Sequence, residues 1–236
     1  MNPATASLGR GLDVLVALAE PEHADGLGVV ALTGIVGGDK SQLSRALATL
    51  ESRGLVARDP ETRAYRLGWR LYTLASCVAE SRLVAEAPPI LRRLVRRLGE
   101  SAHLSVRQGD QVLTLVSESP EATLHAPGRV GGLTPLASTS AGRALALELD
   151  EGELAALGLA AQLDTVARAR ELGYTIVREE FEPGLVAAAA PVRDPAGHVV
   201  AAINVSAPRF RFDARLQEAA RRVVEAAGEL AAAAFR

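Results

Sequence analysis

Apolar side chains recur at helical spacing in three stretches of the first fifty residues. The first predicted helix is Ala4–Glu20, and the second is the short stretch Val29–Ile35. Gly37-Gly38 breaks the pattern sharply before a third helix over residues 39–53. The apolar positions of the short helix that we expect to face inward are Val29, Val30, Leu32 and Val36.

The third helix has a clear start signal and is followed by a hairpin pattern. Asp39 is a good N-cap, and Gln42 three residues later completes a capping box. The buried stripe of this helix is predicted to be Leu43, Ala46, Leu47 and Leu50. Two short alternating runs, residues 55–58 and 64–67, flank a polar turn that contains proline, which predicts a β-hairpin. This order of elements is that of a winged helix-turn-helix.

The rest of the chain mixes helical and alternating periods. A helix is predicted over Trp69–Leu83, and Pro88-Pro89 is expected to start another, Ile90–Leu98. Strands are predicted over residues 102–107, 111–117, 122–126, 174–178, 185–192 and 198–206, and helices over 138–149, 151–157, 163–172 and 213–236. The pattern predicts an α+β protein of two domains. The first domain is residues 1–68, the second is an antiparallel sheet flanked by helices over residues 87–236, and a linker helix over residues 69–86 joins them.

Composition narrows the class of protein. Hydrophobic residues make up 48% of the 236 residues, which supplies a sizeable core and excludes wholesale disorder. The single cysteine, Cys77, excludes an intramolecular disulfide and indicates a reducing compartment. No apolar stretch is long enough to span a membrane, and no basic region precedes an apolar run near residue 1. We therefore expect a soluble, cytoplasmic protein without a membrane partner.

Charge is unevenly distributed, although the formal net charge of the whole chain is only −2. Residues 1–39 contain one basic and five acidic side chains, whereas residues 40–70 contain seven basic and three acidic ones. A short basic block beside an acidic one is most often a solvated surface. Charge alone therefore does not decide in favour of a nucleic-acid partner.

The side of the third helix opposite its leucines points to DNA. It carries short or hydrogen-bonding side chains around one arginine, with a single acid, Glu51, near its far end. Small residues allow a helix to approach the major groove, and Gln or Arg can bond base edges. A solvated amphipathic helix is the alternative, although such helices are usually richer in Glu and Lys. The candidate DNA-contacting residues are Lys40, Ser41, Gln42, Ser44, Arg45 and Thr49 on the helix, and Arg58, Arg63 and Arg66 on the hairpin.

Several short segments occur in an informative order. In the first domain they are residues 7–15 (SLGRGLDVL), 39–50 (DKSQLSRALATL), 58–62 (RDPET) and 65–68 (YRLG); in the second they include 140–145 (SAGRAL), 189–194 (AAPVRD) and 201–208 (AAINVSAP). Together they resemble the IclR family of bacterial transcription regulators over roughly residues 7–230. The resemblance implies a regulator that forms dimers or tetramers. It also implies a GAF-like C-terminal domain that senses a small organic or aromatic acid.

The resemblance implies an effector site near the start of the helix predicted over residues 138–149. From the residues alone, Ser138-Thr139-Ser140 is a capped helix start whose backbone donors suit a carboxylate, although an ordinary N-cap is the simpler interpretation. By position, the family's pocket residues correspond to Ala126, Thr134, Ser140, Ala141, Val177, Ala187, Asn204 and Ser206. Val177 and Ala187 depart from the family pattern, in which aspartate and cysteine or serine are common. A more apolar effector, or none, is therefore expected.

Three hypotheses follow from these patterns. The first is a sequence-specific DNA-binding transcription regulator that acts as a homodimer or dimer of dimers on double-stranded operator DNA and is controlled by a small-molecule effector. The second is a ligand-independent DNA-binding protein with a vestigial pocket. The third is an enzyme with a DNA-binding head, which would need a nucleophile–base pair or a metal cluster.

The sequence predicts no enzyme activity, metal site or cofactor. The four histidines, His23, His103, His125 and His198, are scattered without the spacing of metal ligands. The adjacent acids Glu179 and Glu180 would face opposite sides of a strand, so they could not act on one substrate. The enzyme hypothesis is therefore the weakest of the three.

Overall fold

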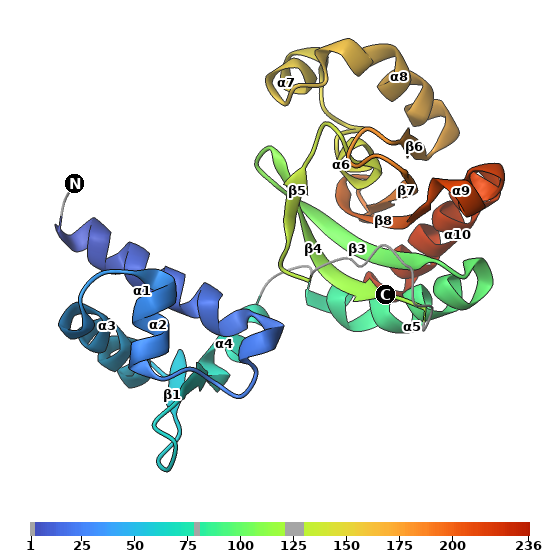
Figure 1. Ribbon diagram of the computed structural model, residues 1–236. Coiled ribbons are helices and arrows are strands. Elements are labelled where there is room, and N and C mark those ends of the chain that lie inside the picture. Colours follow the sequence, from blue (N-terminus) through green and yellow to red (C-terminus); the bar gives the residue numbers. More distant parts are fainter. Residues whose placement is uncertain (1–2, 78–80, 121–129) are drawn as a thin grey trace. The chain divides into compact units, whose positions relative to one another are not determined.

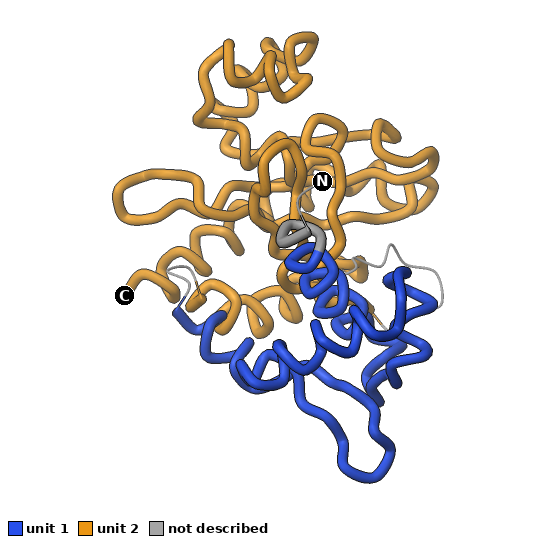
Figure 2. Tube along the Cα trace, turned by 90° about the vertical axis from the view of Figure 1, so that its left-hand side faces the viewer, with its two compact units in different colours: residues 1–79 blue, residues 80–236 orange. Residues whose placement is uncertain are grey.

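The structure is a computed structural model that describes residues 3–77, 81–120 and 130–236 (Figure 1). The chain divides into two compact units, Met1–Ala79 (unit 1) and Glu80–Arg236 (unit 2), which are coloured separately in Figure 2. Their elements confirm the predicted two-domain α+β class. The division falls inside the segment 69–86, whose role as a linker stays a prediction.

Unit 1 is a winged helix-turn-helix. Its elements are α1 (Pro3–Ala19), η1 (Pro21–His23), α2 (Val29–Val36), α3 (Lys40–Ser52), the antiparallel strands β1 (Val56–Arg58) and β2 (Tyr65–Leu67), and α4 (Trp69–Ala75). One small core joins the helices to the hairpin through Val14, Leu18, Leu32, Leu43, Leu47, Val56 and Tyr65. An isolated bridge between Leu27 and Tyr65 ties the loop before α2 to the hairpin.

Two predictions for unit 1 need correction. Val30 was expected to face inward, but its side chain is 74% exposed, whereas Leu32 is fully buried. Side chains two residues apart in a helix point in directions about 200° apart, so Val30 and Leu32 cannot both face the same core. The capping box is also only half formed. The Asp39 side chain caps α3, but the Gln42 side chain accepts a hydrogen bond from Arg10 instead of returning to Asp39.

The helix predicted over Trp69–Leu83 is shorter than expected. α4 ends at Ala75, where the Ser76 and Cys77 amides bond the carbonyl oxygens of Tyr72 and Leu74 in a closing turn. No residue of α4 is buried. Most helical stability in proteins comes from packing of an apolar face, so a helix without buried residues has little to extend it.

Helix α5 (Ser81–Leu98) runs through Pro88 and Pro89, which were expected to start a new helix. A proline inside a helix removes a backbone hydrogen bond and costs roughly 3 kcal/mol. Leu83 before the prolines and Leu91 after them are both buried in the same cluster. Burial on both sides therefore keeps the helix continuous across the two prolines.

Unit 2 contains a six-stranded antiparallel sheet in the order β5-β4-β3-β8-β7-β6. The strands are β3 (Ser101–Gln108), β4 (Gln111–Glu118), β5 (Leu133–Pro135), β6 (Thr175–Arg178), β7 (Leu185–Arg193) and β8 (Val199–Pro208). Five of them match predicted strands within two residues at each end. Strand β5 was missed, because three residues that end in proline carry no alternating pattern. The strand predicted over residues 122–126 lies outside the described residues.

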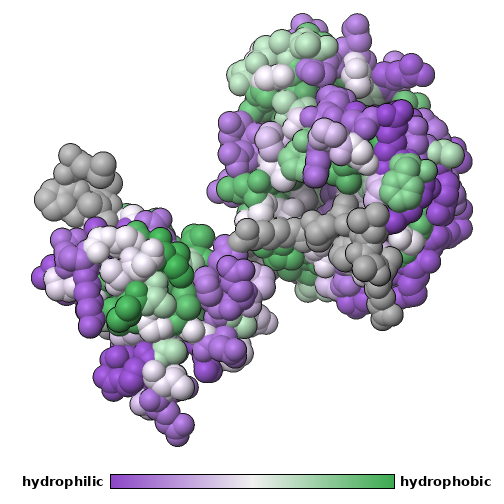
Figure 3. Space-filling model, in the orientation of Figure 1, coloured by the Kyte–Doolittle hydropathy of each residue, from purple (hydrophilic) through white to green (hydrophobic). Residues whose placement is uncertain are grey.

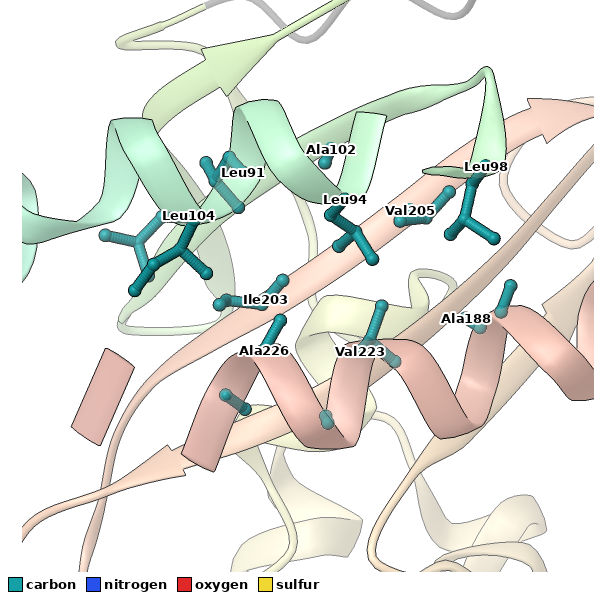
Figure 4. Close-up of a cluster of buried hydrophobic side chains, with 14 of the residues drawn as sticks. Leu91, Leu94, Leu98, Ala102, Leu104, Ala188, Ile203, Val205, Val223 and Ala226 are labelled. Carbon is teal, nitrogen blue, oxygen red and sulfur yellow. The ribbon is translucent and has the colours of Figure 1, made fainter. Parts of the chain in front are cut away.

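Helices cover both faces of this sheet (Figure 1). On one face lie α5 and α10 (Leu216–Ala234). On the other face lie α6 (Ser140–Leu145), α7 (Glu151–Ala156) and α8 (Leu163–Leu172). The remaining elements are the short helices η2 (Ala160–Gln162), α9 (Arg209–Phe212) and η3 (Asp213–Arg215). Figure 4 shows the first layer, where leucines of α5 meet Ile203 of β8 and Val223 of α10. Strand side chains alternate between faces, so Ala188 packs in this layer and Ala189 in the other.

Helix α6 starts two residues later than predicted and ends earlier. Its N-cap is Thr139, whose hydroxyl oxygen accepts from the Gly142 amide at 3.1 Å. A Cβ added at Gly142 would lie only 2.0 Å from the carbonyl oxygen of Leu136. The start of α6 is therefore packed against the chain that leaves β5, at the edge of the cavity described below.

Candidate functional site

One side of α3 is buried and the opposite side is exposed. Leu43 and Leu47 have no exposed surface and anchor the helix in the unit 1 core. Six polar side chains of the helix are exposed and are here together called the α3 outer face: Lys40 at the start of the helix, and Ser41, Gln42, Ser44, Arg45 and Thr49 away from the leucine stripe. All six predicted helix residues are thus exposed at the surface of α3.

Hydrogen bonds commit some of these side chains and leave others available. The Thr49 hydroxyl donates to the carbonyl oxygen of Arg45 at 3.0 Å, one turn earlier in the helix. Within the described part of the chain, no hydrogen bond or ion pair engages the side chains of Lys40, Ser44 and Arg45. These three can therefore meet an external partner without breaking an internal contact.

Asp39 fixes the start of α3. Its Oδ1 accepts from the Ser41 hydroxyl at 2.5 Å, the Ser41 amide at 2.8 Å and the Gln42 amide at 2.9 Å. These bonds, led by that of the Ser41 hydroxyl, hold the pKa of the Asp39 carboxyl below its usual value. The ionised carboxylate also complements the positive end of the helix dipole.

The three hairpin arginines differ in how firmly unit 1 holds them. Arg58 donates from Nε to the carbonyl oxygen of Arg63 at 3.3 Å and lies over the Tyr65 ring. Arg66 donates from Nε to the carbonyl oxygen of Asp25 at 3.1 Å. The Arg63 side chain is exposed in the turn, whose tip forms a hydrophilic projection in Figure 3. All three place positive charge on the hairpin.

Unit 2 encloses a cavity of about 550 Å³ between the sheet, the start of α6 and residues 181–187. Seven of the eight predicted effector-site residues line it: Thr134, Ser140, Ala141, Val177, Ala187, Asn204 and Ser206. The eighth, Ala126, lies outside the described residues. Residues that are far apart in the sequence are thus gathered around one space.

The cavity wall also contains His103, which sequence reasoning did not select. Its Nδ1 lies 3.0 Å from the Ser117 hydroxyl oxygen and its Nε2 lies 3.1 Å from that of Ser206. Burial lowers the pKa of His103 to about 4, so the ring is neutral at pH 7 and donates through only one nitrogen. The alternation of Ser101, His103 and Ser105 with apolar neighbours on β3 was the signal that could have revealed it.

Three buried polar side chains of the cavity wall have no hydrogen-bond partner among the described residues. They are Ser105, Ser140 and Asn204, which are 2%, 2% and 9% exposed. Buried polar groups are costly unless they find partners. The apolar remainder of the wall includes Val112, Leu133 and Phe181. The cavity therefore combines apolar surface with a few polar groups that a ligand could satisfy.

Glu179 and Glu180 lie beyond the end of β6 rather than on it, and both hold the loop that borders the cavity. Glu180 pairs with the guanidinium of Arg143, whose side chain is only 4% exposed. Glu179 pairs with Arg209 and accepts from the Gly184 amide at 2.8 Å. The two acids thus have separate structural partners, and their predicted place on a strand is wrong.

The described residues contain no group of three or more His, Cys, Asp or Glu side chains placed to hold a metal ion. Among the same residues, no helix has the length and apolar character needed to cross a membrane.

Unit 1 has the winged helix-turn-helix fold and an exposed polar helix, which are the features of helix-turn-helix DNA-binding proteins. The chain belongs to the IclR family of bacterial transcriptional regulators. Residues 7–60 match the IclR helix-turn-helix domain, and residues 75–232 match the bacterial transcriptional regulator IclR C-terminal domain. The family resemblance seen in the sequence is therefore confirmed.

Individual relatives agree with this assignment. The HTH-type transcriptional regulator BhcR of Paracoccus denitrificans is 33% identical, with 95% of this chain and 85% of that protein aligned. The HTH-type transcriptional regulator KdgR of Escherichia coli is 30% identical over 90% of this chain and 86% of its own. This chain is thus a transcriptional regulator with a DNA-binding helix-turn-helix, like the relatives it aligns with along most of their length.

Solved structures share the whole fold. An IclR homologue complexed with 4-hydroxybenzoate, from Microbacterium hydrocarbonoxydans, has a TM-score of 0.79 at 21% identity and covers 96% of this chain and 98% of its own. An IclR regulator from Alicyclobacillus acidocaldarius has a TM-score of 0.76 at 23% identity, with 97% and 98% covered. Likeness at this identity establishes the fold.

Proposed function

We propose that this regulator reads double-stranded operator DNA with the α3 outer face and responds to a small-molecule effector bound in the unit 2 cavity. The observation that carries the first part is the separation of the two sides of α3. Leucines hold one side in the core, and the polar side chains of the α3 outer face are exposed. A helix presented in this way fits the major groove.

Each part of the interface has a distinct task in this proposal. Arg45 would bond a base edge through bidentate contacts, and Gln42 would bond one through its side-chain amide. Lys40 and the hairpin arginines Arg58, Arg63 and Arg66 would bind phosphates on either side of the groove, which positions the helix but does not select the sequence. The basic block of residues 40–70 supports this division.

We further propose that a second copy of the chain completes the DNA-binding form. Large apolar side chains are exposed on two helices of unit 1: Leu8, Leu12 and Val16 on α1, and Trp69, Tyr72 and Leu74 on α4. Trp69 alone is 85% exposed. Monomers rarely expose extended apolar surface, which Figure 3 shows on the displayed face of unit 1. Two joined copies, alone or as a dimer of dimers, would read two half-sites in the cytoplasm.

The effector is proposed to be a small organic or aromatic acid. The cavity volume of about 550 Å³ falls in the usual range for small-ligand sites. The solved homologue complexed with 4-hydroxybenzoate supports an aromatic acid as a candidate. An effector can regulate DNA binding only if it binds the arrangement of the protein that binds DNA and the arrangement that does not with different affinities. The proposal assigns regulation, not catalysis, to this unit.

One observation favours a second candidate function. Val177 and Ala187 line the cavity where the family pattern has polar residues, so two potential polar anchors are missing. In this alternative the pocket is vestigial and the protein binds DNA without responding to a ligand.

DNA binding is tested by selecting duplexes from a random library with the purified full-length chain. We expect a two-fold-related motif, and affinity for it that falls as salt rises, because phosphate contacts release counterions. Selection of no motif would contradict the proposal.

The effector is tested by measuring thermal stability in the presence of small carboxylic and aromatic acids, including 4-hydroxybenzoate. A ligand that binds the folded state raises the melting temperature. The same ligand should alter affinity for the selected duplex. If none of the acids raises the melting temperature while DNA binding persists, the ligand-independent alternative is favoured.

A further inference from the structure

Arg10 of α1 reaches the first turn of α3. Its Nη1 donates to Gln42 Oε1 at 2.6 Å. The guanidinium also lies against the backbone of Gly38, where an added Cβ would be only 3.2 Å from Arg10 Nε. Arg10 therefore connects α1 both to the turn before α3 and to a side chain of the α3 outer face.

These contacts hold Gln42 at two points. Its backbone amide donates to Asp39 Oδ1 at 2.9 Å, and its side-chain oxygen accepts from Arg10. With Oε1 directed toward the arginine, the Nε2 amino group is the part of the amide without a partner among the described residues. A long side chain fixed in advance loses less conformational entropy when it binds.

We infer that Arg10 is a positioning residue for base recognition, because it sets the direction in which Gln42 presents its amide to DNA. The inference rests on the proposed function. An outward Nε2 is a hydrogen-bond donor, and in the major groove adenine, guanine and thymine each present an acceptor, whereas cytosine presents only its N4 donor. Wild-type protein therefore disfavours cytosine at the position that Gln42 reads, and this discrimination depends on Arg10.

Two simpler roles for Arg10 make different predictions. If Arg10 bound a phosphate, its loss would weaken all sequences equally and reduce the slope of log affinity against log salt by about 1. If Arg10 only stabilised unit 1, its loss would lower the melting temperature and leave base preference unchanged. Base preference at one position is thus the decisive measurement.

The experiment selects duplexes from a random library with full-length wild type, Gln42→Ala and Arg10→Ala. Both variants should lose the same discrimination against cytosine, by roughly tenfold, which is the loss of one good base contact. The double variant should lose no more than either single variant, because the two residues act as one unit. Arg63→Ala is the matched control: it removes an exposed arginine of the hairpin and should keep the motif while lowering the salt slope.

Two conservative variants keep the test decisive if Arg10→Ala folds poorly. Arg10→Lys retains a donor and should restore part of the discrimination. Gln42→Glu should still pair with Arg10 but present only acceptors, and should therefore turn the discrimination against cytosine into a preference for it. The shift should vanish in the double variant Gln42→Glu with Arg10→Ala.

Several results would overturn the inference. They are an unchanged discrimination against cytosine in Arg10→Ala, a uniform loss with a reduced salt slope, or a Gln42→Glu preference that is independent of Arg10. If wild type selects a motif, any of these results refutes the role of Arg10 and leaves the proposed DNA-binding function standing. If wild type selects no motif, the proposed function fails and the inference fails with it.

Discussion

The candidate functional groups of unit 1 lie on its outer surface, whereas those of unit 2 lie inside it, in the wall of a cavity. In unit 1 these groups are exposed on α3, and Leu43 and Leu47 hold the helix without them. In unit 2, His103, Ser140 and Asn204 are at least nine-tenths buried within the cavity wall. Substitutions on the α3 outer face should therefore change binding and spare stability, whereas substitutions in the cavity wall should change both.

The largest expected effect comes from adding a methyl group at one tight glycine in each unit. A Cβ would lie 2.0 Å from Leu136 O at Gly142, and 2.1 Å from Gly54 O at Gly68. The backbone must shift in either case, so Gly142→Ala should remove about 4 kcal/mol from the unfolding free energy of unit 2, and Gly68→Ala a similar amount from unit 1. Calorimetry should show one transition moving in each variant.

The control for these variants is Gly228→Ala. Nothing lies within 4 Å of a Cβ at this position on α10, so stability should be unchanged or slightly higher. Equal shifts of both transitions in Gly142→Ala would show that the two units unfold together.

Acid should destabilise unit 2 before unit 1. Burial lowers the pKa of His103 from 6.5 to about 4, so between these values the unfolded chain binds a proton that the folded chain does not. Stability should fall as the pH drops from 6.5 to 4, by about 3 kcal/mol in total, and be unaffected by this residue above that range. Melting temperature against pH measures the effect, and His103→Gln should flatten the slope.

Unit 1 should respond at lower pH. Hydrogen bonds from Ser41 and Thr62 lower the pKa values of Asp39 and Asp59 beneath their ordinary value of 3.8. A carboxyl with a lowered pKa contributes stability that is lost only as pH falls below the ordinary value. Loss of unit 1 structure at pH 5 with unit 2 intact would contradict the expected order, in which acid destabilises unit 2 first.

A smaller effect is expected from the ion pair that supports the cavity loop. Glu180→Ala leaves the Arg143 guanidinium, which is only 4% exposed, without its carboxylate. We expect a loss of about 2 kcal/mol, because a buried charge without a partner is costly while Glu180 itself is partly solvated. Denaturant midpoints measure it. Glu229→Ala, which breaks an exposed pair with Arg93, should cost under about 0.5 kcal/mol.

The smallest effect on stability is expected on the α3 outer face. Arg45→Ala should reduce affinity for the selected duplex by roughly tenfold, provided that Arg45 bonds a base edge. The melting temperature should not change, since the Arg45 side chain is exposed and makes no hydrogen bond or ion pair in the described part of the chain. Fluorescence anisotropy measures the affinity, and Arg221→Ala on α10 is the control. Unchanged binding would remove Arg45 from base recognition.

Much of unit 1 could be predicted from the sequence because its signals are local. The stripe of Leu43 and Leu47, the Asp39 cap and the turn at Asp59-Pro60 each lie within a few residues of the element they define. The two errors have different causes. Val30 is exposed because helix geometry itself turns it away from Leu32, whereas Gln42 bonds Arg10, a tertiary contact, rather than its own cap.

The cavity in unit 2 was predictable only through the family resemblance. Seven aligned positions line the cavity, but no periodic pattern links Thr134 with Val177 or Asn204. The alternation of Ser101, His103 and Ser105 marks a polar face of β3 but does not show that this face lines a cavity. The role of His103 in the wall becomes visible only beside Ser206, which is 103 residues away in the chain.

By itself, the sequence determined the local elements and the polar side of α3, because helix spacing, caps and turns depend on neighbouring residues. It also carried the family assignment, because ordered segments survive along the whole chain. Only the tertiary structure decided that α5 continues through Pro88-Pro89, that Arg10 holds Gln42 and that His103 belongs to the cavity. Those features depend on contacts between distant segments, whose burial and hydrogen bonding outweigh local preference.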